Sequence, residues 1–146
     1  MASLSQASAP SSSAVNWSLL LIRIASALAF LYHGSAILFG AFAGPGPQAF
    51  AAYLHAPALV GYLVGLAQFA GGLAMLTGIF ARVGALFLII VMLGAIFLVH
   101  LPHGFDVGKG GLEYALTQLL IALALLIAGP GSYSLASHLP NRLQKL

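Results

Sequence analysis

Charged side chains are scarce in this sequence. Five Lys/Arg and two Asp/Glu make up 5% of its 146 residues, whereas a soluble domain carries about 25% charged residues. Hydrophobic residues account for 61%, and the mean hydropathy is +1.05. A soluble enzyme is excluded, because a soluble fold of this size needs polar and charged side chains to cover its surface. Intrinsic disorder is excluded as well, since it requires low hydrophobicity and high charge.

Cysteine is absent from the chain. This absence excludes disulfides, thiolate nucleophiles and cysteinyl iron–sulfur clusters. The formal net charge is +3 and the pI is near 9.6, but the basic residues are scattered and form no patch. We therefore expect no binding to nucleic acid, and we expect the basic residues to set the membrane topology instead.

Four apolar runs dominate what is present. Each is near the length of about 20 residues that crosses the hydrocarbon core of a bilayer. They cover residues 17–39, 57–80, 83–100 and 112–128, separated by the Gly/Pro segment GAFAGPGPQ, by Ala81-Arg82 and by LPHGFDVGKGG. Since backbone polar groups in lipid must be paired internally, the runs predict an all-α integral membrane four-helix bundle over residues 17–139 that contacts the lipid bilayer.

The two ends of the chain differ from this domain. Residues 1–16 are uncharged and rich in Ser and Ala, which predicts a disordered tail, and residues 140–146 form a short basic tail. An even number of spans places both termini on the same side as the Ala81-Arg82 turn. That side then carries three basic residues and the opposite side one: Arg82, Arg142 and Lys145 against Lys109. This bias predicts a multi-pass protein of the inner (cytoplasmic) membrane with both termini in the cytoplasm.

Most of the ionisable side chains fall on the extracytoplasmic side of this topology: His33, His55, His100, His103, Asp106, Lys109 and Glu113. Imidazole and carboxylate groups bind Zn, Cu or Fe, and histidine also relays protons near neutral pH. His33 and His100 could hold a haem from opposite sides. The spacing typical of a metal-binding motif is missing, so no metal site is predicted, and an interfacial polar cluster explains the same residues.

Three polar residues within the runs each have two interpretations. Glu113 begins the fourth run, where it either caps a helix or accepts protons at a quinone head group. Arg23 lies about 9 Å beyond Trp17 along a helix, so it either reaches back to the cytoplasmic interface or faces the bundle and pairs with Gln68 or a ligand oxygen. Gln68 shares a helix face with Gly61, Gly65 and Gly72, a pattern typical of close helix packing.

A short sequence motif is repeated in the first and third runs. Residues 30–33 read Phe-Leu-Tyr-His, and residues 97–100 read Phe-Leu-Val-His. In the predicted topology these two helices are parallel, so a duplicated hairpin would place His33 and His100 at the same depth.

Several short motifs, in their order and spacing, resemble the DoxX family of small four-helix membrane proteins over nearly the whole chain after the tail. These motifs are Leu20 to Arg23, His33-Gly34, Leu38-Phe39-Gly40, Gly71-Gly72-Leu73, Gly78, Arg82, His100 to Phe105, Gly111 to Tyr114, Gly129-Pro130-Gly131 and Ser134-Leu135. The chain departs from the family pattern at three positions, where Ile37, Gln68 and Ala136 replace a Lys, a Glu and an Asp. If the family's activity needs those charges, this member has lost it.

The resemblance implies a place in membrane oxidoreductase assemblies, which include thiosulfate:quinone oxidoreductase subunits. We expect a subunit of a quinone-linked assembly, with quinone as the cofactor ahead of haem or metal and with other membrane subunits or a second copy as partners. Its candidate polar site comprises His33, His100, His103, Glu113, Arg23 and Gln68. The alternatives are a non-catalytic accessory subunit and, behind it, a small transporter. The redox hypothesis requires His33 and His100 to point into one shared cavity.

Overall fold

A computed structural model describes residues 12–140, and every regular element within that range is helical. The five α-helices are α1 (Ser12–Phe39), α2 (Gly46–Tyr53), α3 (Ala58–Thr77), α4 (Ala81–Ala95) and α5 (Glu113–Ala128). Single turns of 3-10 helix lie at Ala41–Ala43, Leu101–His103, Val107–Lys109 and Leu135–His138, and a π-helical turn spans Ile96–His100. The all-α prediction is confirmed.

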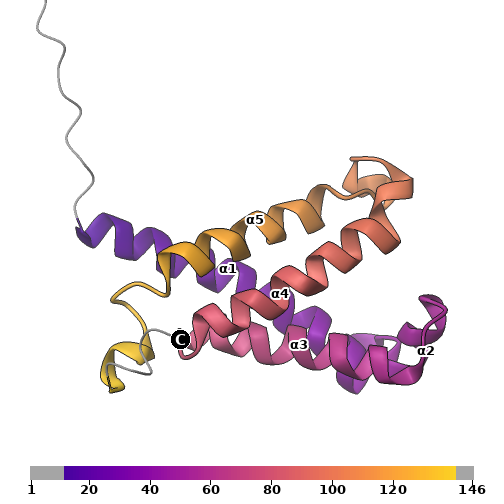
Figure 1. Ribbon diagram of the computed structural model, residues 1–146, viewed down its shortest axis with the longest axis horizontal. Helices are drawn as coiled ribbons and strands as arrows, with labels where there is room; N and C mark the ends of the chain where they lie inside the picture. Colours follow the sequence, from indigo (N-terminus) through magenta and orange to yellow (C-terminus); the bar gives the residue numbers. More distant parts are fainter. Residues whose placement is uncertain (1–11, 141–146) are drawn as a thin grey trace, which may run out of the picture.

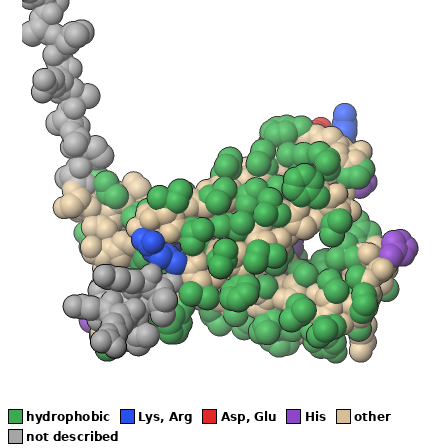
Figure 2. All heavy atoms as spheres, viewed as in Figure 1, with side chains coloured by type: hydrophobic (Ala, Val, Ile, Leu, Met, Phe, Trp, Pro, Cys, Tyr) green, Lys and Arg blue, Asp and Glu red, His purple; other side chains and the backbone are tan. Residues whose placement is uncertain are grey.

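The distribution of polar and apolar side chains is the reverse of that in a soluble protein. Large apolar side chains cover the outside of the helices, as Figure 2 shows; Phe97 and Ile127, for example, are 63% and 78% exposed. The buried polar side chains are Arg23, Ser26, Gln68 and Gln118. An apolar outer surface around a core that contains polar groups is what a lipid environment requires, so the chain is an integral membrane protein.

Within residues 12–140, three helical segments are long and apolar enough to cross a membrane: Ser12–Phe39, Ala58–Thr77 and Ala81–His103. The helix α5 is also apolar but has 16 residues, which corresponds to about 24 Å of rise against roughly 30 Å of hydrocarbon. The length of α5 alone therefore falls short of a full crossing.

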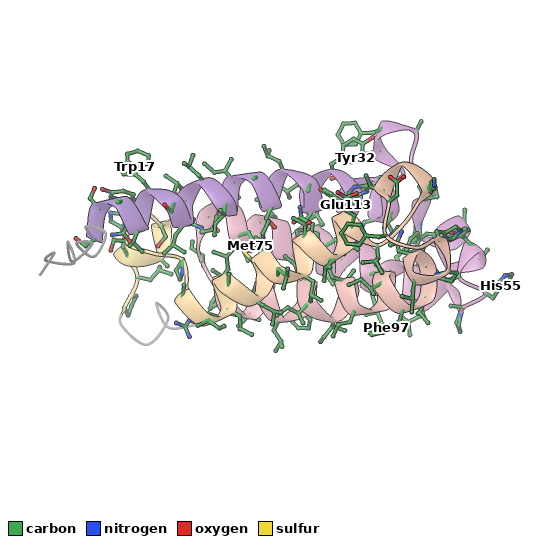
Figure 3. The ribbon with its side chains drawn as sticks, turned by 90° about the horizontal axis from the view of Figure 1, so that it is seen from above. Trp17, Tyr32, His55, Met75, Phe97 and Glu113 are labelled. Carbon is green, nitrogen blue, oxygen red and sulfur yellow. The ribbon has the colours of Figure 1, made fainter. Side chains whose placement is uncertain are left out.

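The helices form two packed groups that separate toward one end of the molecule. The helix α1 packs along α3, while α4 lies between α3 and α5 (Figure 1). Glycines allow the close approach of α1 and α3, since a Cβ atom at Gly72 would lie 3.0 Å from the main-chain nitrogen of Leu31. From the α3–α4 turn, α4 diverges from α3 toward the end that carries α2 and residues 101–112 (Figure 1). Met75, at 0% exposure, lies in the middle of the bundle (Figure 3).

The helix α1 begins at Ser12, so residues 12–16, which we expected to be disordered, are helical. The cause is tertiary contact with the C-terminal segment. The main-chain N–H of Ser132 donates to Asn16 Oδ1 at 2.8 Å, and the rings of Trp17 and Tyr133 meet at 5.0 Å. Composition alone does not reveal these partners. Residues 1–11 of the predicted tail and residues 141–146 of the basic tail lie outside the described residues.

Other boundaries also differ from the prediction. The second apolar run ends as a helix at Thr77 rather than residue 80, because Gly78 adopts a positive φ of 78°. The third run starts two residues early and changes from α to π geometry after Ala95. The Gly/Pro segment contains α2, which the pattern did not indicate because eight residues are too few for a clear helical period.

Candidate functional site

A cavity of about 400 Å³ lies at the end where the two helix groups separate. Its walls come from all five α-helices and from the connection between α4 and α5. Figure 2 shows the molecule hollowed between that connection and α2. The volume is within the range of ligand-binding cavities, roughly 300–1,000 Å³.

Six polar side chains line this cavity among mostly apolar ones. They are His33, Tyr53, Gln68, His100, Tyr114 and Gln118. Phe30, Phe50, Leu54 and Met92 contribute to the apolar walls. No Asp, Glu, Lys or Arg is among the lining residues. A mainly apolar cavity with a few polar groups suits a neutral small molecule better than an ion.

His33 and His100 come from different helical segments and line the same cavity. His33 makes no hydrogen bond within residues 12–140; its ring lies 6.5 Å from that of Tyr114. His100 lies in the π-helical turn, and its Nδ1 is 2.7 Å from the carbonyl oxygen of Gly110. Because a carbonyl only accepts, Nδ1 must donate the proton, which leaves Nε2 of the neutral ring as an acceptor.

Gln68 and Gln118 are both 6% exposed, but only one of them is satisfied by the protein. The Oε1 atom of Gln118 accepts a hydrogen bond from Ser26 Oγ at 2.9 Å. The Gln68 amide makes no hydrogen bond within the described part of the chain, although it borders the cavity. No buried side-chain nitrogen or oxygen atom among the described residues lacks a hydrogen-bond partner, so the Gln68 amide is open to the cavity rather than sealed off from it. An amide in this position is therefore suited to bind a polar atom of a ligand.

Glu113 and His103 do not line the cavity; they fold the connection between α4 and α5. Glu113 Oε2 accepts from the main-chain N–H of Val107 at 3.1 Å, and His103 Nδ1 donates to the carbonyl of Val99 at 2.9 Å. Figure 3 shows Glu113 where that connection meets α5, and His55 at the far tip of the molecule. Glu113 and His103 thus stabilise the connection, parts of which line the cavity, but they do not line the cavity themselves.

Arg23 lies at the opposite end of the bundle and is 1% exposed. Its guanidinium donates to four main-chain carbonyls, at 2.8 Å to Met75, 3.0 Å to Leu76, 2.7 Å to Pro130 and 2.9 Å to Tyr133. It therefore joins the last turn of α3 to the segment after α5. Its guanidinium does not pair with Gln68.

Of the six residues in the predicted polar site, the structure brings together His33, His100 and Gln68. Sequence reasoning missed Tyr114 and Gln118 as neighbours of these three. A signal was available, because Gln118 is an isolated amide within the apolar run 112–128, and polar residues inside spans usually face the bundle interior. Tyr114 lies one helical turn before Gln118 on the same face.

The donor set is poor for a metal ion. Within residues 12–140, no group of three or more His, Cys, Asp or Glu side chains is close enough to hold one. The cavity instead combines two imidazoles, two amides and two phenols with aromatic walls. These groups can donate hydrogen bonds to a ligand and accept them from it.

Comparison with known proteins gives one match. The family model DoxX matches residues 18–101, more than half of the chain. The match includes His33, Gln68 and His100 but ends before Tyr114 and Gln118. Neither a curated protein nor a solved structure matches the chain.

Proposed function

The chain belongs to the DoxX family, and from this membership we propose that it is an integral membrane subunit of a redox assembly that binds the head group of a quinone in the cavity described above. The observation that carries the proposal is that His33 and His100 line one cavity together with the unpartnered amide of Gln68. Members of this family are often linked to redox or quinone-related functions.

The polar groups of the cavity fit a flat ring with oxygen atoms on it. The Gln68 amide N–H donates to a carbonyl oxygen, and His100 Nε2 accepts from a hydroxyl. Phe30 and Tyr114 offer aromatic surface to the ring. A bound quinone supplies two-electron, two-proton redox chemistry. His33 and His100 are the cavity residues whose ring nitrogens can accept or donate a proton, since no carboxylate of the described residues lines the cavity.

The proposal includes a topology of four crossings with both termini in the cytoplasm of the inner membrane. Arg23 supports it by bonding the end of α3 to the segment after α5, which brings the end of α5 to the same side as the α3–α4 turn. The 101–112 connection, with Lys109, and the cavity then lie at the extracytoplasmic end. Arg82, in the α3–α4 turn, lies at the cytoplasmic end, in agreement with the positive-inside rule.

Binding of a water-soluble quinone without a tail to the full chain in lipid nanodiscs tests the proposal. We expect His33→Phe and Gln68→Leu each to weaken binding by about tenfold, the loss typical of a removed hydrogen bond to a ligand. His138→Phe is the matched control, because His138 is exposed at the opposite end. The proposal fails if the unaltered protein does not bind the quinone, or if all three variants bind it equally.

A second candidate function is that of an accessory subunit that binds the ring but transfers no electrons. It is favoured by the absence of charged side chains from the cavity and by the neutral residues Ile37 and Ala136, which are 7% and 2% exposed. Gentle purification from the native membrane, followed by an oxidised-minus-reduced absorption spectrum, separates the two. A haem or flavin signal that travels with the chain supports a redox assembly. Partner subunits that purify with the chain without such a signal favour the accessory subunit.

A further inference from the structure

A second hollow runs along the outer face of the α3–α4 hairpin. It has a volume of about 930 Å³, and its walls are apolar side chains that include Leu63, Leu66, Phe80 and Phe87. Thr77 is its one hydroxyl-bearing residue, and the Thr77 hydroxyl donates to the carbonyl of Leu73 at 2.8 Å. The groove therefore offers a ligand only apolar surface.

Small residues form the floor of this groove. A Cβ atom at Gly84 would lie 2.7 Å from the Cβ of Ala74, and one at Gly71 would lie 2.8 Å from the side chain of Leu88. The two helices thus touch along their backbones, and the larger side chains stand on either side. From Val64 to Thr77 the groove follows α3 for about 20 Å at the rise of an α-helix.

The groove and the polar cavity share three lining residues, Val64, Ile90 and Val91. Along α4 and the π-helical turn that follows it, groove residues run from Val83 to Val91 and cavity residues from Ile90 to His100. The two hollows therefore adjoin end to end where α3 and α4 begin to diverge. The polar part faces the extracytoplasmic end, and the apolar part follows the face that the lipid covers.

We propose that the ligand of this protein is an amphiphile with a long hydrocarbon chain, whose ring lies in the cavity and whose chain leaves past Val64 and Ile90 to lie in the α3–α4 groove. This inference rests on the proposed function and adds the chemical class of the ligand. The occupant follows from continuity: a polar site that adjoins a purely apolar groove matches a molecule with a polar ring at one end and a hydrocarbon chain at the other.

The contribution of the groove is steric rather than hydrophobic. Lipid chains are as apolar as the groove, so a hydrocarbon chain gains little transfer free energy by moving from the bilayer into it. A ring seated in the cavity, however, needs an open path for its chain. Filling the groove near Val64 therefore affects a ligand with a chain and leaves one without a chain unaffected.

The test compares two probes on the full chain in nanodiscs: a methoxy-substituted benzoquinone without a chain, and the same ring with a decyl chain. Ala67→Phe places a large side chain in the groove one turn from Val64, and Ala67 does not line the cavity. We expect this variant to weaken binding of the decyl probe about tenfold, through overpacking at the chain's path, and to leave the affinity for the chain-free probe unchanged. Ala124→Phe, on the exposed face of α5 away from both hollows, is the matched control.

Ala70→Phe is the second variant in case Ala67→Phe does not fold, since Ala70 lines the groove and is exposed. The inference is overturned if the groove variants bind the decyl probe as the unaltered protein does, or if they lose both probes equally. In either case binding of the chain-free probe to the unaltered protein still supports the proposed function. If the unaltered protein binds neither probe, both proposals are overturned.

Discussion

We expect Arg23→Met to destabilise the protein by about 3 kcal/mol, because four main-chain carbonyls lose their donor at once. The Arg23 Nε–H bond to Met75 is buried, and the bonds to Leu76, Pro130 and Tyr133 are partly buried. Methionine fills a similar volume but donates no hydrogen bond. The last turn of α3 and the segment after α5 then lose the group that joins them.

The size of the expected loss in stability depends on how many of those carbonyls remain shielded from water. An acceptor left unpaired in a buried place costs about 1–3 kcal/mol, and this applies in full to the Met75 carbonyl. Each of the three partly buried bonds contributes about 0.5–1.5 kcal/mol, because water replaces part of what is lost. Together these contributions amount to roughly 2.5–7.5 kcal/mol. We expect a net loss near the lower end, about 3 kcal/mol, because methionine does not carry the cost of burying a guanidinium.

Thermal unfolding of the full chain in detergent measures the effect, and we expect Tm to fall by roughly 10 °C. A second measurement shows which segment of the chain is loosened. The chain has no cysteine, so a single Ser132→Cys substitution gives a site for a thiol reagent in the segment that Arg23 holds. That cysteine should react faster when Arg23 is replaced, since Ser132 then loses the support of its neighbours Pro130 and Tyr133.

Arg82→Met is the matched control at the same end of the bundle. Arg82 is partly exposed and donates one hydrogen bond, at 3.2 Å, to the carbonyl of Ile127. Its replacement should cost less than about 1 kcal/mol, as for other exposed polar contacts. If the two arginine variants lose the same free energy of unfolding, the explanation is wrong, because the larger loss at Arg23 is attributed to its burial and to its four carbonyl acceptors.

Three further predictions concern other parts of the chain. Gln68→Leu should leave thermal stability unchanged, since the Gln68 amide makes no hydrogen bond within residues 12–140, while it weakens quinone binding; a fall in Tm would contradict this. Gln118→Leu should lower stability by about 1–3 kcal/mol because it leaves the Ser26 hydroxyl unpaired, and the double variant with Ser26→Ala should recover most of the loss, as measured by a double-mutant cycle. In intact cells, a membrane-impermeant maleimide should label Lys109→Cys, whereas Ser132→Cys should react only after permeabilisation; the reverse result would invert the proposed topology.

Much of the fold could be read from hydropathy. The all-α class, the four apolar segments and the ends of two of them follow from composition and from Gly/Pro punctuation, because lipid allows few other backbone solutions. The start of α1 could not be predicted, since residues 12–16 are helical through contacts with Ser132 and Tyr133. The helix α2 was missed for a related reason: it is short, and it packs so closely on α3 that a Cβ at Gly61 would collide with the carbonyl oxygen of Pro47.

The candidate site was only partly predictable. The paired motifs that end in His33 and His100 suggested a common depth, and the structure places both residues at one cavity. Glu113 looked equally suited to that site, but its carboxylate turns to the main-chain N–H of Val107. Side-chain direction depends on which hydrogen-bond partner is nearest in space, and spacing along the chain does not encode that partner.

The composition alone places this chain in a membrane, because seven charges in 146 residues cannot cover a soluble surface and four apolar runs can cross a bilayer. The roles of the few polar groups follow instead from how the helices pack. Packing buries Arg23, whose hydrogen bonds join two main-chain segments. It places Gln68 beside two histidines, with no hydrogen-bond partner among residues 12–140. The physical reason is that a polar group inside a bundle in lipid needs a partner, from the protein or from a ligand, and which partner lies within reach depends on how the helices pack.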